Sequence, residues 1–275
     1  MPGLRRQAVP GSRRRCSVRK SVLPRRFERI QRLPTEICEV PTDNGGLIPE
    51  ELDKILETTP NCKFIYVIPD FQNPTGRTWS MERRQKFMEV VNKHNLPVLE
   101  DNPYGELRYE GTILPSLKSM DTKGLVMFLG TFSKIFCPGL RLGWIAAEHS
   151  LLSEFVKIKQ SADLHTSNFD QGVADAYMEQ YDLDEHVKEI VALYKHRRDL
   201  ILESMEKYFP AGTEWTHPEG GLFLWLTFPE GVSARKVFNK CIEMKVAGVI
   251  GDAFYPNQKT DRSMRINYSN MPDDR

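Results

Sequence analysis

Short apolar segments alternate with amphipathic segments along most of this chain. The apolar segments have the length of buried strands, and they cover residues 64–68, 97–100, 125–129 and 143–147. Helical patterns lie between them, one at 50–58 behind Pro49 and one that begins at Ser80, a typical N-cap residue, and ends near residue 94. Strands that alternate with helices predict an α/β fold, a mostly parallel sheet with helices on both faces.

The second part of the chain has a different order of elements. An amphipathic helix is predicted at 184–208, and it is followed by strands and one further helix, at 222–228, 233–245, 246–250 and 264–268. This order predicts a smaller α+β domain. We therefore expect three parts, which are a basic, disordered segment at 1–37, a large domain at 38–183, and the long linking helix with the small domain at 184–275.

The first 37 residues carry most of the charge asymmetry. They hold ten arginines and Lys20 against Glu28 and Glu36, a net charge of +9, while the rest has 27 basic and 35 acidic residues, a net charge of −8. The segment has no apolar periodicity, which predicts disorder. A solvated tail, an organelle transit peptide and an incorrectly assigned start remain open. Because the remainder is acidic, we expect no nucleic-acid partner.

Composition narrows the class of protein further. The 275 residues are 40% hydrophobic and 27% charged, as in soluble globular proteins. No apolar stretch approaches the ~20 residues of a membrane span, so no membrane partner is expected. Five scattered cysteines without a CxxC pair indicate reduced thiols in the cytoplasm. The six histidines lack HxxxH or HxH spacing, so no metal is expected.

The strongest chemical signal follows the strand predicted at 125–129. Thr131 and Ser133 lie three and one residues before Lys134, and Arg141 lies seven residues after it. Two hydroxyls and a guanidinium can surround a phosphate with hydrogen-bond donors. A lysine with cationic neighbours and partial burial can lose its proton and attack a carbonyl. This pattern predicts a Schiff-base lysine inside a phosphate site, and the alternative is a solvated surface charge.

Polar residues also follow two other predicted strands. Asn73 begins Asn-Pro-Thr-Gly after the strand at 64–68, and Asp101 and Tyr104 follow the strand at 97–100. Each segment alone is compatible with an ordinary turn. However, the carboxyl ends of parallel strands meet at one edge of a sheet, where ligands bind in open α/β folds. Together with the Lys134 segment, they predict a single site at this edge.

This combination of motifs resembles the class I/II aminotransferases of pyridoxal-phosphate fold type I. The resemblance rests on NPTG, on Asp-x-x-Tyr, and on Thr-x-Ser-Lys followed by PGLRLG, and it runs from about residue 40 to 272. Residues 159–166 are similar to the subgroup that contains 2-aminoadipate aminotransferases. By this resemblance, Lys134 would hold pyridoxal 5′-phosphate as an aldimine and then move the substrate α-proton. Asp101 would face the pyridine nitrogen and keep it protonated.

The resemblance also implies roles for the other residues of these motifs. Asn73 and Tyr104 would bind the phenolic oxygen of the cofactor, and the cofactor phosphate would be held by Thr131, Ser133 and Arg141. Arg265 would clamp the substrate α-carboxylate in a bidentate way, with Asn73 beside it. We therefore expect Lys134, Asp101 and Tyr104 to be the catalytic residues.

The implied function is the transfer of an amino group from an α-amino acid to a 2-oxo acid by a cytoplasmic homodimer. Members of the family carry a Gly/Ser-rich phosphate turn before the region equivalent to residue 40, and a last helix after the region equivalent to residue 275. We therefore expect both domains to be truncated. The alternatives are an inactive truncated remnant, a lyase that uses the same cofactor, and a ligand-sensing regulator domain on the same fold.

Overall fold

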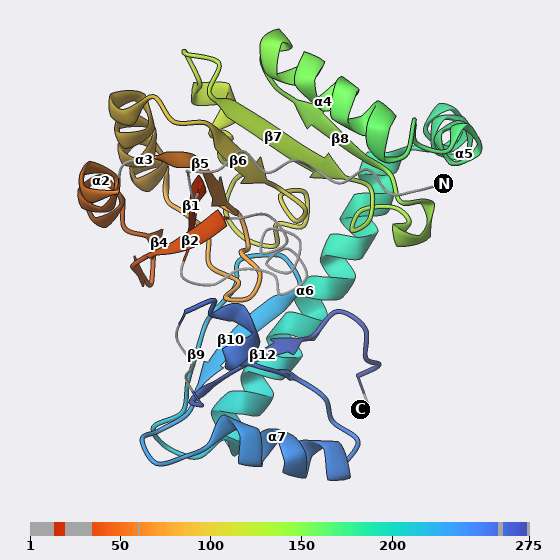
Figure 1. The fold of residues 1–275 in the computed structure, drawn as a ribbon. Coiled ribbons are helices and arrows are strands. Elements are labelled where there is room, and N and C mark those ends of the chain that lie inside the picture. The colour runs from red at the N-terminus through yellow and green to blue at the C-terminus, as the bar shows by residue number, and fades with distance from the viewer. Residues whose placement is uncertain (1–13, 20–34, 60, 258–260, 274–275) are drawn as a thin grey trace, which may run out of the picture.

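The fold is built from two sheets that a long helix connects (Figure 1). A computed structural model of the chain describes residues 14–19, 35–59, 61–257 and 261–273. The large domain holds a six-stranded sheet whose strands, in spatial order, are β2 (Thr35–Val40), β1 (Arg14–Arg19), β5 (Cys62–Val67), β6 (Val98–Asp101), β7 (Val126–Thr131) and β8 (Gly143–Ala146). Neighbouring strands are parallel, except that β8 is antiparallel to β7. The prediction of an α/β fold with a mostly parallel sheet is confirmed.

Helices and short elements surround this sheet. They are the hairpin β3 (Thr42–Asp43) and β4 (Gly46–Leu47), and then α2 (Pro49–Thr58), α3 (Met81–His94), η1 (Lys118–Met120), η2 (Pro138–Leu140), α4 (His149–Ala162) and α5 (Asn168–Gln180). The hydroxyl of Ser80 accepts a hydrogen bond from the Arg83 amide at 3.2 Å, so Ser80 caps α3 as its sequence predicts. Buried side chains of α2 and α3 form one apolar core with β5, β6 and β7.

Strand β1 is the main difference from the expected organisation. The sequence predicts disorder for residues 1–37, yet residues 14–19 form a strand that pairs with β2 on one side and with β5 on the other. Pairing on both sides satisfies the backbone N–H and C=O groups of this strand, and such pairing does not depend on the side chains. The side-chain pattern therefore gave no sign of the strand. Residues 35–37 also belong to a strand, β2, and the remaining residues of that segment, 1–13 and 20–34, lie outside the described residues.

The small domain follows the linking helix α6 (Leu183–Tyr208), which Asp182 caps. It contains an antiparallel sheet of the strands β9 (Glu214–Trp215), β10 (Phe223–Thr227), β11 (Val249–Ile250) and β12 (Ser263–Asn267). Two helices belong to the same domain, α7 (Ala234–Glu243) and η3 (Gly251–Phe254). Its strand order is β11-β12-β10-β9. Met205 of α6 packs against β10 and β12 in the core of this domain. The predicted smaller α+β domain is thus present.

A further apolar cluster joins the two domains close to the ends of β5 and β6. Phe71, Tyr104 and Phe223 are buried there, and Ile190 and Tyr194 of α6 pack against them. The cluster packs the loop after β5 against the start of β10 in the small domain. Within the described residues, none of the helices is both long enough and apolar enough to cross a membrane.

Candidate active site

Three loops meet at the carboxyl edge of the large sheet. The loop that contains Asn73 follows β5, Asp101 ends β6, and Thr131 ends β7. Because β5, β6 and β7 are successive neighbours in the sheet, these three segments lie side by side. The structure therefore places the sequence-predicted residues of the large domain at one edge, where ligands bind in open α/β sheets.

Asp101 is one of the buried polar residues of this edge. Its side chain is 3% exposed, and the Tyr66 hydroxyl donates a hydrogen bond of 2.5 Å to its Oδ2 atom. Tyr66 lies on β5 opposite Leu99 of β6, and Asp101 shares a face with Leu99 because side chains alternate along a strand. Tyr66 was not among the residues predicted for this site. Its hydroxyl within an apolar run was a signal, but the register that brings it to Asp101 could not be known.

Asn73, Tyr104 and Arg265 form a chain of polar contacts across the two domains. The Asn73 Nδ2 atom donates to the Tyr104 hydroxyl at 3.3 Å, and an Arg265 amino group donates to Asn73 Oδ1 at 2.9 Å. Asn73 and Tyr104 are buried, and the peptide between Asn73 and Pro74 is cis. The small domain thus contributes Arg265, from β12, to a site that otherwise belongs to the large domain.

The guanidinium of Arg265 is held between aromatic rings. Its Cζ atom lies 4.1 Å from the ring centroid of Phe223 and 5.1 Å from that of Phe254. Its Nε atom is buried and has no hydrogen-bond partner among the described residues. Burial lowers the pKa of Arg265, and the nearby Tyr104 opposes this effect. A guanidinium fixed in this way, with a donor left over, suits a carboxylate that arrives from outside the chain.

Lys134 lies in the loop after β7, between residues that can hold an anion. The Ser133 amide donates to Thr131 Oγ1 at 3.1 Å, and the two hydroxyl oxygens are 3.0 Å apart. Arg141 has a left-handed backbone, with φ of 57°, and its exposed guanidinium donates to the Pro138 carbonyl at 3.0 Å. This loop therefore collects two hydroxyls, one guanidinium and one ammonium group.

The environment of Lys134 favours its neutral form. The side chain is half-buried, and this burial lowers its pKa, as do the positive charges of Arg141 and Arg265. A lysine with a lowered pKa is nucleophilic at lower pH than a solvated lysine. The effect of both charges also indicates that Lys134 lies near Arg265 as well as near Arg141.

The donors and acceptors of this site fit pyridoxal phosphate. Hydroxyl and guanidinium donors in the 131–141 loop suit its phosphate, and the amine of Lys134 suits its aldehyde. The buried carboxylate of Asp101 suits a protonated ring nitrogen. Asn73 and Tyr104 have hydrogen-bonding atoms for a phenolic oxygen. The unpartnered Nε of buried Arg265 agrees with a further, carboxylate-bearing ligand.

The large α/β domain carries a lysine at the carboxyl edge of its sheet, and the small domain adds an arginine to the same site. This is the arrangement of the pyridoxal-phosphate fold type I. A sequence model of the family "Aminotransferase class I and II" matches residues 28–275. The chain belongs to this family.

Individual relatives agree with this assignment. The chain is 40% identical over 244 residues to aromatic-amino-acid aminotransferase 1 of Thermococcus litoralis, which covers 87% of this chain and 58% of that protein. It is 31% identical over 235 residues to 2-aminoadipate transaminase of Thermus thermophilus, covering 84% and 59%. The crystal structure of Pyrococcus horikoshii kynurenine aminotransferase, in complex with PMP, superposes with a TM-score of 0.91 at 36% identity, covering 95% of this chain and 66% of that chain.

The chain is shorter than these relatives, since it spans 58% and 59% of the two curated proteins. Within the matched part, the resemblance to class I/II aminotransferases and to the subgroup with 2-aminoadipate aminotransferases is confirmed.

Proposed function

We propose that this chain transfers an amino group from an α-amino acid to a 2-oxo acid, with pyridoxal 5′-phosphate as its cofactor. The observation that carries the proposal is the position of Lys134. It is a half-buried amine whose pKa is lowered by burial and by two arginines, in a loop beside a strand that ends in a buried aspartate. Membership of the aminotransferase family favours amino-group transfer over the lyase and regulator alternatives.

Each residue of the site has a role in this proposal. When bound, pyridoxal phosphate supplies a ring that withdraws electrons from the α-carbon of the amino acid. Lys134 holds the cofactor through its amine and moves the proton of the α-carbon. Asp101 holds a proton on the ring nitrogen, and Tyr66 orients Asp101 through its 2.5 Å hydrogen bond.

The remaining residues bind and orient. Thr131, Ser133 and Arg141 bind the phosphate in this proposal, and the Asn73–Tyr104 pair binds the phenolic oxygen. Arg265 binds the α-carboxylate and fixes the direction of the α-hydrogen toward Lys134, which determines the bond that is broken. The relatives are named for aromatic amino acids and 2-aminoadipate, and we propose amino acids of that range as substrates.

Covalent labelling tests this proposal without requiring turnover. The protein is incubated with pyridoxal phosphate, reduced with borohydride, and mapped by mass spectrometry. We expect the label on Lys134, its loss in Lys134→Ala, and its retention in Lys157→Ala, which removes an exposed lysine of α4. Equal labelling of several exposed lysines, with no loss in Lys134→Ala, would overturn the proposal. Product analysis with phenylalanine and a 2-oxo acid then distinguishes a transaminase from a lyase, which releases ammonia.

We also propose a homodimer that works in the cytoplasm. Helix α5 exposes Phe169, Val173 and Met178, with Phe169 at 78%, and such apolar patches are typical of surfaces that a partner covers. The thiols of Cys137 and Cys241 are free, as in a reducing compartment. Light scattering should give twice the mass of 31.7 kDa, and Phe169→Glu should shift the protein toward the monomer. A wild-type monomer at micromolar concentration would contradict the dimer.

A further inference from the structure

Phe71 has an unusual backbone conformation two residues before Asn73. Its φ is 45°, in the left-handed region, and its side chain is fully buried. Such a conformation is disfavoured for a bulky residue and persists only where the surroundings hold it. The Phe71 amide donates to the Thr78 hydroxyl at 3.3 Å, and the Arg108 guanidinium carbon lies 4.8 Å from the ring centroid.

Two glycines of the small domain, Gly220 and Gly221, lie directly against Phe71. A Cβ atom at Gly220 would lie 2.4 Å from Phe71 Cζ and 2.3 Å from the Leu107 carbonyl oxygen. A Cβ atom at Gly221, whose φ is 79°, would lie 2.6 Å from Phe71 Cβ. The Gly221 amide also donates to the Leu107 carbonyl at 2.8 Å. Both positions thus require glycine because the two domains meet there in direct backbone contact.

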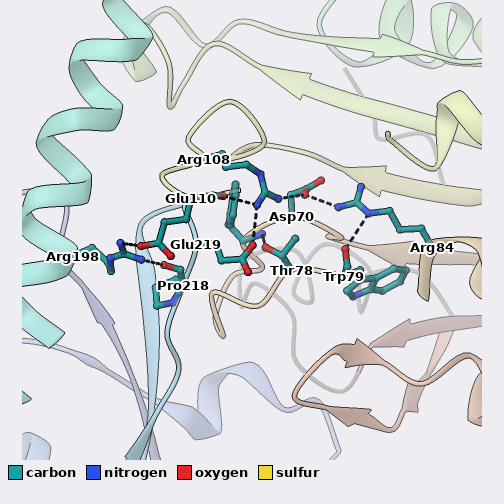
Figure 2. A network of polar contacts seen from close by, with 10 residues as sticks. Asp70, Thr78, Trp79, Arg84, Arg108, Glu110, Arg198, Pro218 and Glu219 are labelled. Atoms are coloured by element: carbon teal, nitrogen blue, oxygen red, sulfur yellow. Dashed lines mark hydrogen bonds and ion pairs between the residues drawn. The ribbon is translucent and has the colours of Figure 1, made fainter. Parts of the chain in front are cut away.

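Buried charges extend this contact, as Figure 2 shows. Asp70 accepts a 2.6 Å hydrogen bond from Arg84 and lies 3.5 Å from an amino group of Arg108. Arg108 in turn donates to Glu219 at 2.9 Å, so the chain of charges runs from α3 to the small domain. Arg84 and Arg108 are buried, whereas Glu219 is at the rim. Buried ion pairs of this kind add little net stability, because the desolvation of the charges offsets their attraction, but loss of one partner leaves the other charge buried and unpaired.

The junction connects directly to the two residues that face the substrate carboxylate. On the large-domain side, Asn73 lies two residues after Phe71. On the small-domain side, Gly221 leads into β10, where Phe223 packs under Arg265 and Trp225 is paired with it. The 2.9 Å hydrogen bond between Arg265 and Asn73 therefore connects the two domains, and the junction determines how far apart these two residues lie.

We propose that the Phe71 junction, composed of Phe71, Arg108, Glu219, Gly220 and Gly221, is a positioning device for the substrate carboxylate. The proposal rests on the proposed function, because it assigns Arg265 to an α-carboxylate. The junction fixes Arg265 relative to Asn73 without contacting the ligand. It controls substrate affinity more strongly than cofactor attachment at Lys134, since Gly220 and Gly221 meet Phe71 directly, whereas the 131–141 loop reaches the Phe71 cluster through the partly buried Ile135.

Gly220→Ala tests the proposal, with Gly172→Ala as the matched control because a Cβ atom at Gly172 meets nothing within 4 Å. The protein is loaded with pyridoxal phosphate and titrated with 3-phenylpropanoate in a calorimeter. This carboxylate has no amino or keto group, so it binds without reacting. We expect Gly220→Ala to weaken its binding by about tenfold or more, and to raise KM more than it lowers kcat. The affinity for pyridoxal phosphate should stay within about twofold of wild type.

A second variant keeps the test decisive if Gly220→Ala does not fold. Glu219→Gln removes the rim ion pair with Arg108, and Glu214→Gln is its control on the neighbouring exposed strand β9. We expect a smaller loss of carboxylate affinity in Glu219→Gln and none in Glu214→Gln. Carboxylate binding at the wild-type level in the folded variants, or an equal loss of cofactor and carboxylate binding, would overturn the positioning role. A wild-type protein that binds no pyridoxal phosphate would instead overturn the proposed function, and this inference with it.

Discussion

The two sides of the candidate site differ in how far the protein itself satisfies their polar groups. The buried floor, composed of Tyr66, Asn73, Asp101 and Tyr104, is almost inaccessible and is connected by hydrogen bonds of 2.5 Å and 3.3 Å. The open loop, residues 131–141, is half-buried or exposed. Its hydroxyls bond to one another and to the backbone, and Arg141 bonds to the Pro138 carbonyl.

This difference indicates a division of labour. Groups in the buried floor are already oriented, so they can stabilise charge without the cost of reorganisation during the reaction. Groups in the open loop must exchange their present hydrogen bonds for those of a phosphate, so their contribution appears in cofactor affinity. We therefore expect substitutions in the floor to change turnover, and substitutions in the loop to change cofactor binding.

Asp101→Asn should have the largest effect on turnover. The amide keeps the shape and can still accept the Tyr66 hydrogen bond, but it lacks the negative charge that a cationic ring needs. We expect turnover to fall by about 10²–10³-fold, with the borohydride label on Lys134 retained. The matched control is Asp175→Asn, on the outer helix α5. Turnover within about threefold of wild type would contradict the role of the buried floor.

The buried carboxyl group of Glu100, on the same strand as Asp101, should make the stability of the protein depend on pH. Burial raises the pKa of Glu100 to about 7 from 4.5, although the Leu117 and Lys118 amides donate to it. Between these two pH values the folded protein binds this proton more tightly than the unfolded chain does. The free energy of unfolding should therefore fall as pH rises from about 4.5 through about 7, by about 3 kcal/mol in total, and should level off about one pH unit above 7, where the folded protein has also lost the proton.

Denaturant titrations of wild type and Glu100→Gln between pH 4.5 and 8 check this prediction. The variant should lose the downward slope, and the control Glu106→Gln, at an exposed carboxylate, should keep it. Parallel pH profiles for wild type and Glu100→Gln would show that Glu100 is not the titrating group. The slope is the readout because the substituted amide also changes the contacts with the two backbone donors.

Thr131→Val should affect the open loop without affecting the chemistry. The valine keeps the shape but loses the hydroxyl that bonds Ser133 and the Leu142 carbonyl. We expect the affinity for pyridoxal phosphate to weaken by about tenfold, as for one charge-assisted hydrogen bond, with turnover at saturating cofactor little changed. Fluorescence titration with the cofactor measures the effect, and Thr58→Val on α2 is the control. A turnover loss as large as that of Asp101→Asn would abolish the distinction between floor and loop.

Besides the loss of its phosphate contact, Arg141→Gln should give the smallest of these effects, a shift in the pH dependence of cofactor attachment. Burial and the charges of Arg141 and Arg265 hold the pKa of Lys134 below its ordinary value. Removal of one positive charge raises that pKa, so the neutral amine appears only at higher pH. The rate of cofactor attachment, followed by absorbance, should therefore need higher pH in the variant than in wild type. An unchanged profile would show that Arg141 does not act on Lys134.

The local sequence pattern predicted several strands and helices around the site, but it did not predict which elements pack or pair with one another. The helix that Ser80 caps and the long helix at 184–208 have strong local signals, and the structure has α3 at Met81–His94 and α6 at Leu183–Tyr208. Helices α4 and α5 were not predicted, and they lie at the periphery, since α4 has no buried residue and α5 buries only Ala174. Strand β1 depends on its two neighbours and has no local signal.

By itself, the sequence determined the motifs, because NPTG, Asp-x-x-Tyr and the Lys134 segment are each contiguous and follow apolar runs that form strands. Only the tertiary structure decided that Tyr66 bonds Asp101, and that Arg265 reaches Asn73 across 192 residues. It also decided that two glycines of the small domain must fit against Phe71. The physical reason is that strand register and domain packing are set by the fit of distant surfaces, which no local pattern records.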